Sequence, residues 1–271
     1  MSRWGFIGLG KMGGAILKAS LKQLEQASNQ SLEKPIRGFD ASPEILSSCE
    51  KLPNFEGCDS ASEVLEVSDI VVVAVKPYQI EPLFQGLEFK KRHLIISVCA
   101  GIESAQIHQW SGGQAQVLRA MPNLGAQLNV SMTVFAHAKE IQEDYRLECE
   151  TVFRKMGELL WVDESQMDFV TALSGSGPGY FFYWMKGFVD AALRRGFDEP
   201  TARLIVSQTC LASGMLAKGG ARSLEEWQNS VATKGGTTEA GLDCLKAAQL
   251  EKTIEECLEA ATSRSKELRK K

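Results

Sequence analysis

The sequence predicts an α/β fold in two domains: an N-terminal Rossmann domain with a mostly parallel, doubly wound sheet, and an all-α C-terminal domain. Short apolar runs alternate with helix-like segments through the first half of the chain, which is typical of βαβ units and a parallel sheet. A glycine-rich turn directly follows the first apolar run. Beyond Asp163 only helical spacing of apolar residues remains, so no strands are expected there.

Five strands are expected in the first domain. The strongest candidate, Asp69 to Val75, is rich in β-branched residues and shows no polar alternation, as expected of a strand covered on both faces. The other candidates are 4–7, 36–40, 94–98 and 117–120. Between the first two strands, Met12, Ala15, Ile16 and Ala19 recur at the spacing of one helix face.

The second domain is expected to be helical throughout. Apolar residues recur at helical spacing in the segments 181–192, 205–217 and 250–261. We therefore divide the chain into a Rossmann domain, 1–163, and a helical domain, 164–271. The aromatic and Met stripe from Phe181 to Phe188 is expected to pack in a core or against a second copy of the chain.

Composition excludes several functional classes. A net charge of −4 offers no basic surface for nucleic acid. The seven cysteines form no CxxC pair, and the three histidines lack metal-ligand spacing, so neither disulfides nor a metal site is expected. No apolar run approaches the roughly 18 residues of a membrane span. The first residues lead directly into a strand without room for a signal peptide, so we expect a cytoplasmic protein.

A G-x-G-x-x-G motif lies between the first strand and the first helix, the context in which it indicates dinucleotide binding. The first glycine makes a tight turn, the second lets the pyrophosphate approach the backbone, and the third lets the helix pack on the strand. The helix N-terminus supplies N–H groups and partial positive charge. The predicted cofactor-binding residues here are Gly8, Leu9, Gly10, Lys11, Met12 and Gly13.

Residues at the end of the second strand bear on which dinucleotide binds. Asp40 can accept the adenosine ribose hydroxyls, which favours NAD. Ser42 and Arg37 could instead serve a 2′-phosphate, although Arg37 lies early in the strand. Asp40 can equally begin a turn and cap the next helix. Asp40 and Ser42 are included in the predicted cofactor site, and these residues leave the choice of dinucleotide open.

Other strand ends are expected to complete the cofactor site, because ligands bind at the carboxyl ends of strands in an open parallel sheet. Lys76 follows the long apolar strand and should border the nicotinamide, with a solvated loop cation as the alternative. The small or rigid residues at the next two strand ends allow a flat ring to approach the backbone. The predicted residues are Ala74, Val75, Lys76, Pro77, Ala100, Gly101, Pro122 and Asn123.

Two glycine-rich segments lie in the helical half. Ser174-Gly175-Ser176-Gly177-Pro178 superficially resembles a nucleophile elbow, but no strong strand precedes it and no histidine follows, so a serine hydrolase is not expected. The segment from Thr233 to Glu239 places two glycines and two hydroxyls before a helix. Such a cradle of N–H groups suits a carboxylate. A glycine-rich loop with a threonine N-cap is the alternative.

In this order, the motifs resemble those of the pyrroline-5-carboxylate reductase family, and the resemblance covers essentially the whole chain. It implies the final step of proline biosynthesis, the reduction of Δ1-pyrroline-5-carboxylate to L-proline, usually with NADPH. NADH is the alternative that Asp40 favours. The matching motifs are Gly8-Leu9-Gly10-Lys11-Met12-Gly13, Ala74-Val75-Lys76-Pro77, Arg119-Ala120-Met121-Pro122-Asn123, Ser174-Gly175-Ser176-Gly177-Pro178 and Gly235-Gly236-Thr237-Thr238.

The resemblance also implies roles for the last motif and a quaternary structure. Backbone N–H groups of the loop Gly235, Gly236, Thr237 and Thr238 would bind the substrate carboxylate, and the Thr238 hydroxyl would approach the ring nitrogen as the catalytic group. Members of the family dimerise through interlocked C-terminal helices, and some form larger rings. The chain departs from the family pattern at Thr233-Lys234, where Ser-Pro is frequent, and at Gly179, where alanine is frequent.

Two other functions are compatible with part of the sequence. The opening segment would suit a β-hydroxyacid dehydrogenase, but the helical domain lacks the Lys-x-x-x-Asn pair of that family, because Lys186 is followed by Asp190 at the corresponding spacing. A non-catalytic dinucleotide sensor would need the first glycine motif but not the Gly-Gly-Thr-Thr loop. The joint presence of both motifs favours an enzyme.

Overall fold

The computed structural model describes residues 2–27, 35–137 and 141–268. Residue contacts divide the chain into two compact units: a sheet unit, residues 1–176 and 260–271, and a helical unit, residues 177–259. The last turns of the C-terminal helix therefore belong to the sheet unit. The division into 1–163 and 164–271 stays a prediction.

An eight-stranded sheet of order β3-β2-β1-β4-β5-β6-β7-β8 forms the centre of the sheet unit. Neighbours from β3 to β6 pair in parallel, β7 runs antiparallel to β6, and β8 runs parallel to β7. The mostly parallel Rossmann sheet is thus confirmed. The strands are β1 (Trp4–Ile7), β2 (Ile36–Phe39), β3 (Phe55–Gly57), β4 (Ile70–Val73), β5 (Leu94–Ser97), β6 (Gln116–Met121), β7 (Ser131–Ala136) and β8 (Gly157–Val162).

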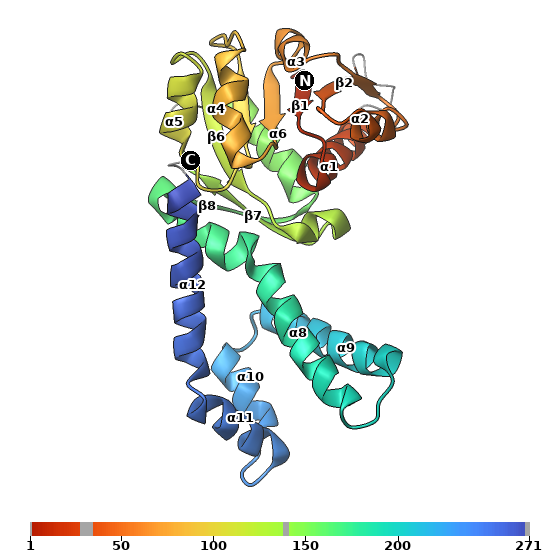
Figure 1. The fold of residues 1–271 in the computed structure, drawn as a ribbon, viewed down its shortest axis with the longest axis vertical. Coiled ribbons are helices and arrows are strands. Elements are labelled where there is room, and N and C mark those ends of the chain that lie inside the picture. The colour runs from red at the N-terminus through yellow and green to blue at the C-terminus, as the bar shows by residue number, and fades with distance from the viewer. Residues whose placement is uncertain (1, 28–34, 138–140, 269–271) are drawn as a thin grey trace. The chain divides into compact units, whose positions relative to one another are not determined.

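Helices cover both faces of this sheet (Figure 1). The central strand β4 shows why its sequence is uniformly apolar: Ile70 and Val72 pack into one core layer, Val71 and Val73 into the other, and all four are fully buried. One face carries α1 (Lys11–Ala27), α2 (Pro43–Cys49) and α6 (Glu143–Arg154); the other carries α3 (Ala61–Val67), α4 (Pro77–Gln85) and α5 (Ser104–Trp110).

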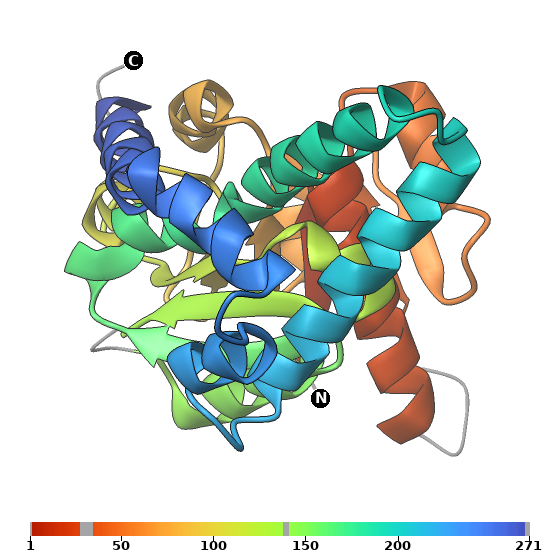
Figure 2. The ribbon, with the colours of Figure 1, turned by 90° about the horizontal axis from the view of Figure 1, so that it is seen from below.

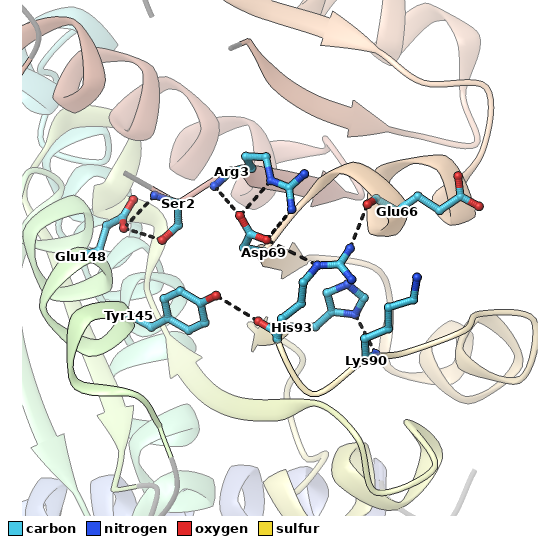
Figure 3. Close-up of polar contacts among 9 residues, drawn as sticks. Ser2, Arg3, Glu66, Asp69, Lys90, His93, Tyr145 and Glu148 are labelled. Atoms are coloured by element: carbon cyan, nitrogen blue, oxygen red, sulfur yellow. Dashed lines mark hydrogen bonds and ion pairs between the residues drawn. The ribbon is translucent and has the colours of Figure 1, made fainter. Parts of the chain in front are cut away.

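A polar cluster ties together the amino ends of β1, β4 and β5 (Figure 3). Arg3 holds Asp69 through two side-chain hydrogen bonds, of 2.9 Å from Nε and 2.6 Å from Nη2. The Tyr145 hydroxyl donates to the carbonyl oxygen of Arg92 at 3.1 Å. Because ligands of such sheets bind at the opposite, carboxyl edge, we assign this amino-edge cluster a structural role.

A buried ion-pair network joins the last turns of the C-terminal helix to the sheet. Arg119 on β6 has a fully buried side chain and pairs with Glu164 at 2.9 Å and with Asp168 at 3.3 Å. Ser265, in the last turns of α12 (Leu250–Glu267), donates to Asp168 at 2.9 Å. A buried charge that loses its partner is strongly destabilising, so this network fixes the C-terminal turns to β6.

The helical unit contains α8 (Gly177–Leu193), α9 (Glu199–Lys218), α10 (Leu224–Val231), α11 (Thr237–Ala247) and the start of α12. Helices α8 and α9 form a hairpin (Figures 1 and 2). Among the described residues no strand follows Val162, which confirms the all-α prediction. The aromatic stripe on α8 is exposed, with Phe181 at 63% and Tyr183 at 80%, so it does not pack in the core of its own chain.

Candidate active site

The three motif glycines of the first loop meet different surroundings. Gly8 has a φ of +90°, and a Cβ there would lie 2.9 Å from the backbone of Ala74. A Cβ on Gly13 would lie 2.0 Å from the carbonyl oxygen of Gly8. Gly10 has ordinary backbone geometry and nothing within 4 Å of a built Cβ. Two glycines are therefore required by the fold, whereas Gly10 faces open space that a ligand can fill.

The N-terminus of α1 adjoins this open space. Within the described residues, no acceptor is recorded for the N–H groups of Lys11, Met12 and Gly13, as expected in the first turn of a helix. The first turn carries no acidic residue. Unpaired N–H groups and the positive end of the helix dipole fit a pyrophosphate here.

A groove of about 860 Å³ continues from the glycine loop along α1. It is lined by Lys11, Lys18 and Lys22, with residues of α2 and of the 3-10 helix η1 (Leu124–Leu128) on its other sides. Of these lysines, the glycine motif includes only Lys11, although helical spacing places Lys18 and Lys22 on the same side of α1. Three lysines against one acidic lining residue, Glu44, give the groove a net positive charge, which favours anionic ligands.

The Asp40 carboxylate binds backbone N–H groups of two loops, the glycine loop and the turn before α2. Its carboxylate accepts the Leu9 N–H at 2.6 Å and the Ser42 N–H at 2.9 Å. Ser42 is the N-cap of α2. Arg37, the other candidate for a 2′-phosphate, pairs with Glu56 at 2.8 Å. Asp40 thus begins the turn, as predicted, but Ser42 caps the helix, so the prediction that Asp40 caps it is wrong. The contacts of Asp40 and Ser42 with a cofactor stay predictions.

The ends of β4 and β5 place the next predicted residues. Lys76 is exposed directly before α4, and its N–H donates to the Gln79 side chain at 3.0 Å. Gly101 has a φ of +77°, and a Cβ there would lie 2.4 Å from the carbonyl oxygen of Ser265. The packing of α12 therefore requires this glycine independently of any cofactor, whose contact with Ala100 and Gly101 stays a prediction.

Cys99, beside these residues, is a structural thiol. Its side chain is buried and donates to the carbonyl oxygen of Val75 at 3.3 Å. Burial raises the pKa of the Cys99 thiol to about 11. Because the thiolate is the nucleophilic form, Cys99 is unreactive at neutral pH.

Two motifs distant in sequence meet at the end of β6. The Asn123 side chain donates to the Ser174 hydroxyl at 3.3 Å and accepts the Gly125 N–H at 3.0 Å. A Cβ on Gly175 would lie 3.2 Å from the sulfur of Met121. Both motifs are evident in the sequence, but Ser174 was not predicted as a site residue, because the contact between the motifs is a tertiary feature that no local pattern predicts.

The Gly-Gly-Thr-Thr loop lies in the helical unit and leads into α11, whose first residues are Thr237 and Thr238. The Gly235 N–H donates to Glu239 at 2.6 Å, and the Gly236 N–H donates to the Thr233 carbonyl oxygen at 2.9 Å. Gly236, rather than a threonine, is the N-cap, so the threonine-cap alternative is wrong. Within the described residues, no acceptor is recorded for the N–H groups of Thr237 and Thr238. They form an uncapped helix N-terminus suited to a carboxylate.

The described parts of the chain contain neither a metal-ligand cluster nor a membrane-spanning helix. No group of three or more histidine, cysteine or acidic side chains there is placed to hold a metal ion. No helix there combines the length and apolar character needed to cross a membrane.

A Rossmann sheet with an open glycine loop at a helix N-terminus defines the class of dinucleotide-binding proteins. Two family models match: NADP oxidoreductase, coenzyme F420-dependent, over residues 3–101, and pyrroline-5-carboxylate reductase dimerisation, over residues 164–268. The chain belongs to the pyrroline-5-carboxylate reductase family, as the following relatives show.

The pyrroline-5-carboxylate reductase of Haemophilus influenzae is 32% identical, over 97% of this chain and 96% of the relative. That of Pseudomonas aeruginosa is 31% identical, over 98% of this chain and 96% of the relative. The crystal structure of Plasmodium falciparum pyrroline carboxylate reductase with NADP bound has a TM-score of 0.87 at 23% identity, covering 99% and 98% of the two chains. The structural likeness shows a shared fold.

Proposed function

We propose that this chain reduces Δ1-pyrroline-5-carboxylate to L-proline with NADPH, an oxidoreductase reaction on a C–N bond in proline biosynthesis. One observation carries the proposal: within the described residues, α1 behind Gly10 and α11 at Thr237 and Thr238 both begin with open N-termini next to glycine-rich loops. The first suits a pyrophosphate and the second a carboxylate. Membership of the family supports this pairing, whereas a non-catalytic sensor leaves the second N-terminus unexplained and a β-hydroxyacid dehydrogenase would need the Lys-x-x-x-Asn pair that Lys186 and Asp190 do not provide.

The residues of the first loop fit a dinucleotide. The space beyond Gly10 admits the pyrophosphate, and the N–H groups of Lys11 to Gly13 would hold it. The match to an NADP oxidoreductase model over residues 3–101 supports NADPH, with NADH as the alternative. When bound, the cofactor supplies the hydride. The predicted strand-end residues Ala74 to Pro77, Ala100, Gly101, Pro122 and Asn123 would border its nicotinamide.

The residues of the second loop orient the substrate. The N–H groups of Thr237 and Thr238 would bind the carboxylate of the ring, and Gly235 and Gly236 shape the turn that exposes them. The Thr238 hydroxyl would form a hydrogen bond at the ring nitrogen. A cyclic imine needs a hydride at carbon and a proton at nitrogen; because the protonated imine is already electrophilic, positioning can supply much of the rate enhancement.

The chain is proposed to act as a homodimer through its helical unit, with a larger ring as an extension, and in the cytoplasm. Support comes from the exposed aromatic side chains of α8, because large exposed apolar patches mark association surfaces. The family model that matches residues 164–268 describes dimerisation.

Purified protein tests the activity directly. We expect NADPH absorbance to fall when pyrroline-5-carboxylate is added and L-proline to accumulate, with a higher kcat/KM for NADPH than for NADH. A preference for NADH would show that Asp40 contacts the ribose and excludes the 2′-phosphate. Absence of turnover with either cofactor would contradict the proposal, and turnover of 3-hydroxy acids instead would favour the β-hydroxyacid dehydrogenase function.

Thr238→Ala tests the proposed catalytic hydroxyl. The variant keeps the backbone N–H groups, so carboxylate binding should partly survive, while kcat/KM falls about tenfold or more through loss of a hydrogen bond to a charged group. Thr238→Ser restores a hydroxyl and should recover much of the activity. A wild-type kcat/KM in Thr238→Ala would show that the Thr238 hydroxyl takes no part in catalysis and that the residue is only part of the first turn of α11.

A further inference from the structure

Glu239 already occupies part of the loop that is proposed to bind the substrate. Its carboxylate accepts the Gly235 N–H at 2.6 Å. Gly236 is unavailable as well, because its N–H donates to the Thr233 carbonyl oxygen. An incoming carboxylate therefore meets the N–H groups of Thr237 and Thr238 and, one residue further along α11, a carboxylate of the protein itself.

The neighbouring helix α10 provides a contrast within the same unit. At α10, Glu226 accepts the Ser223 N–H at 2.7 Å and Ser223 accepts the Glu226 N–H at 3.1 Å, a closed capping box. At α11 the N-cap is Gly236, which has no side chain to cap the helix. Glu239 reaches one residue further back, to Gly235, and leaves the first turn open.

On the basis of the proposed function, we infer that Glu239 determines the specificity of the carboxylate subsite. The Glu239 carboxylate competes with ligand carboxylates, so the subsite selects zwitterionic ligands over simple anions. Its negative charge offsets the partial positive charge of the α11 N-terminus and the cation of the adjacent Lys234. A simple carboxylic acid anion is then weakly bound. A protonated cyclic imine with a carboxylate has no net charge, and its cation is not repelled by Glu239.

Glu239→Gln removes the charge but keeps an amide oxygen that can accept the Gly235 N–H. A charge at a helix terminus changes an affinity by about two- to fivefold. The probe is cyclopentanecarboxylate, a ring carboxylate without nitrogen, used as a competitive inhibitor of pyrroline-5-carboxylate reduction by the full chain. We expect its inhibition constant to fall about two- to fivefold in Glu239→Gln, with a smaller change in KM for the zwitterionic substrate.

Glu226→Gln is the matched control, because it removes the same charge from the same position of a neighbouring helix. It should leave the inhibition constant and KM unchanged. Glu239→Asp keeps the negative charge, so cyclopentanecarboxylate should bind to it as weakly as to the wild type. If Glu239→Gln does not fold, a wild-type inhibition constant in Glu239→Asp is the result that the inference predicts.

The outcomes separate the two proposals. If the wild type fails to reduce pyrroline-5-carboxylate, the proposed function and this inference both fall. If the wild type is active and the inhibition constant of Glu239→Gln is unchanged or higher, only the inference is overturned, and Glu239 is a structural cap.

Discussion

Gly10 differs from its neighbours in what a side chain at its position would meet. Gly8 and Gly13 are held by backbone conformation and by close contacts within the loop, so their substitution disturbs the fold itself. A side chain on Gly10 would project into open space. Gly10 is thus the position at which the cofactor site can be blocked with the least effect on folding.

Gly10→Val should leave the thermal midpoint nearly unchanged and weaken NADPH binding at least tenfold, about 1.4 kcal/mol, because the branched side chain would occupy the space of the pyrophosphate. Fluorescence titration with NADPH measures the affinity. Gly86→Val is the matched control, since a Cβ on that exposed glycine has a single neighbour, at 3.8 Å. Normal NADPH affinity in Gly10→Val would refute the assignment of the cofactor loop.

At the scale of elements, the amino-edge cluster contains a buried histidine next to β5. His93 is 1% exposed, and its Nδ1 accepts the Lys90 N–H at 3.1 Å. Burial, aided by the positive charges of Arg92 and Lys90, lowers the pKa of His93 to about 4 from an ordinary value of 6.5. The folded state therefore binds a proton at His93 less readily than the unfolded state does.

Stability should consequently fall between pH 6.5 and pH 4, the window between these two pKa values. Below pH 6.5 the His93 side chain is protonated in the unfolded chain but stays neutral in the folded chain. The free energy of unfolding therefore decreases as the pH falls. Urea denaturation at pH 7 and pH 4.5 should show a loss that is ~2 kcal/mol larger in the wild type than in His93→Gln. His137→Gln, at an exposed position, should behave as the wild type. Equal losses in the wild type and His93→Gln would contradict the assignment.

The elements that could be predicted are those whose sequence is dominated by burial. Strand β4 is apolar because both faces are covered, and its pattern alone identified it. Strand β3, Phe55–Gly57, is too short to produce a pattern. Strands β7 and β8 extend the sheet beyond β6, and both run antiparallel to β6. Their addition depends on pairing between distant segments and not on local sequence.

The candidate site divides in the same way. The glycine loop was predictable because its function requires a fixed local spacing. The Asn123–Ser174 contact and the contact between Gly101 and Ser265 join residues far apart in sequence, so no motif could indicate them. The Glu239–Gly235 bond was also missed, although a glutamate in the first turn of a helix is a known signal for capping.

At the scale of the whole molecule, the predicted cofactor-binding and substrate-binding residues lie in different units. The sheet unit carries the open glycine loop and the strand ends, and the helical unit carries the Gly-Gly-Thr-Thr loop and exposed aromatic side chains. The reaction proposed for the chain is a direct hydride transfer from the dinucleotide to the cyclic imine.

Isotope transfer tests that claim most directly. NADPH carrying deuterium on one or the other face of the nicotinamide C4 is incubated with pyrroline-5-carboxylate and the protein, and the product is analysed by mass spectrometry and NMR. We predict L-proline with one deuterium at C5 from one of the two labelled cofactors. Proline without deuterium from both cofactors, or no proline at all, would contradict the account.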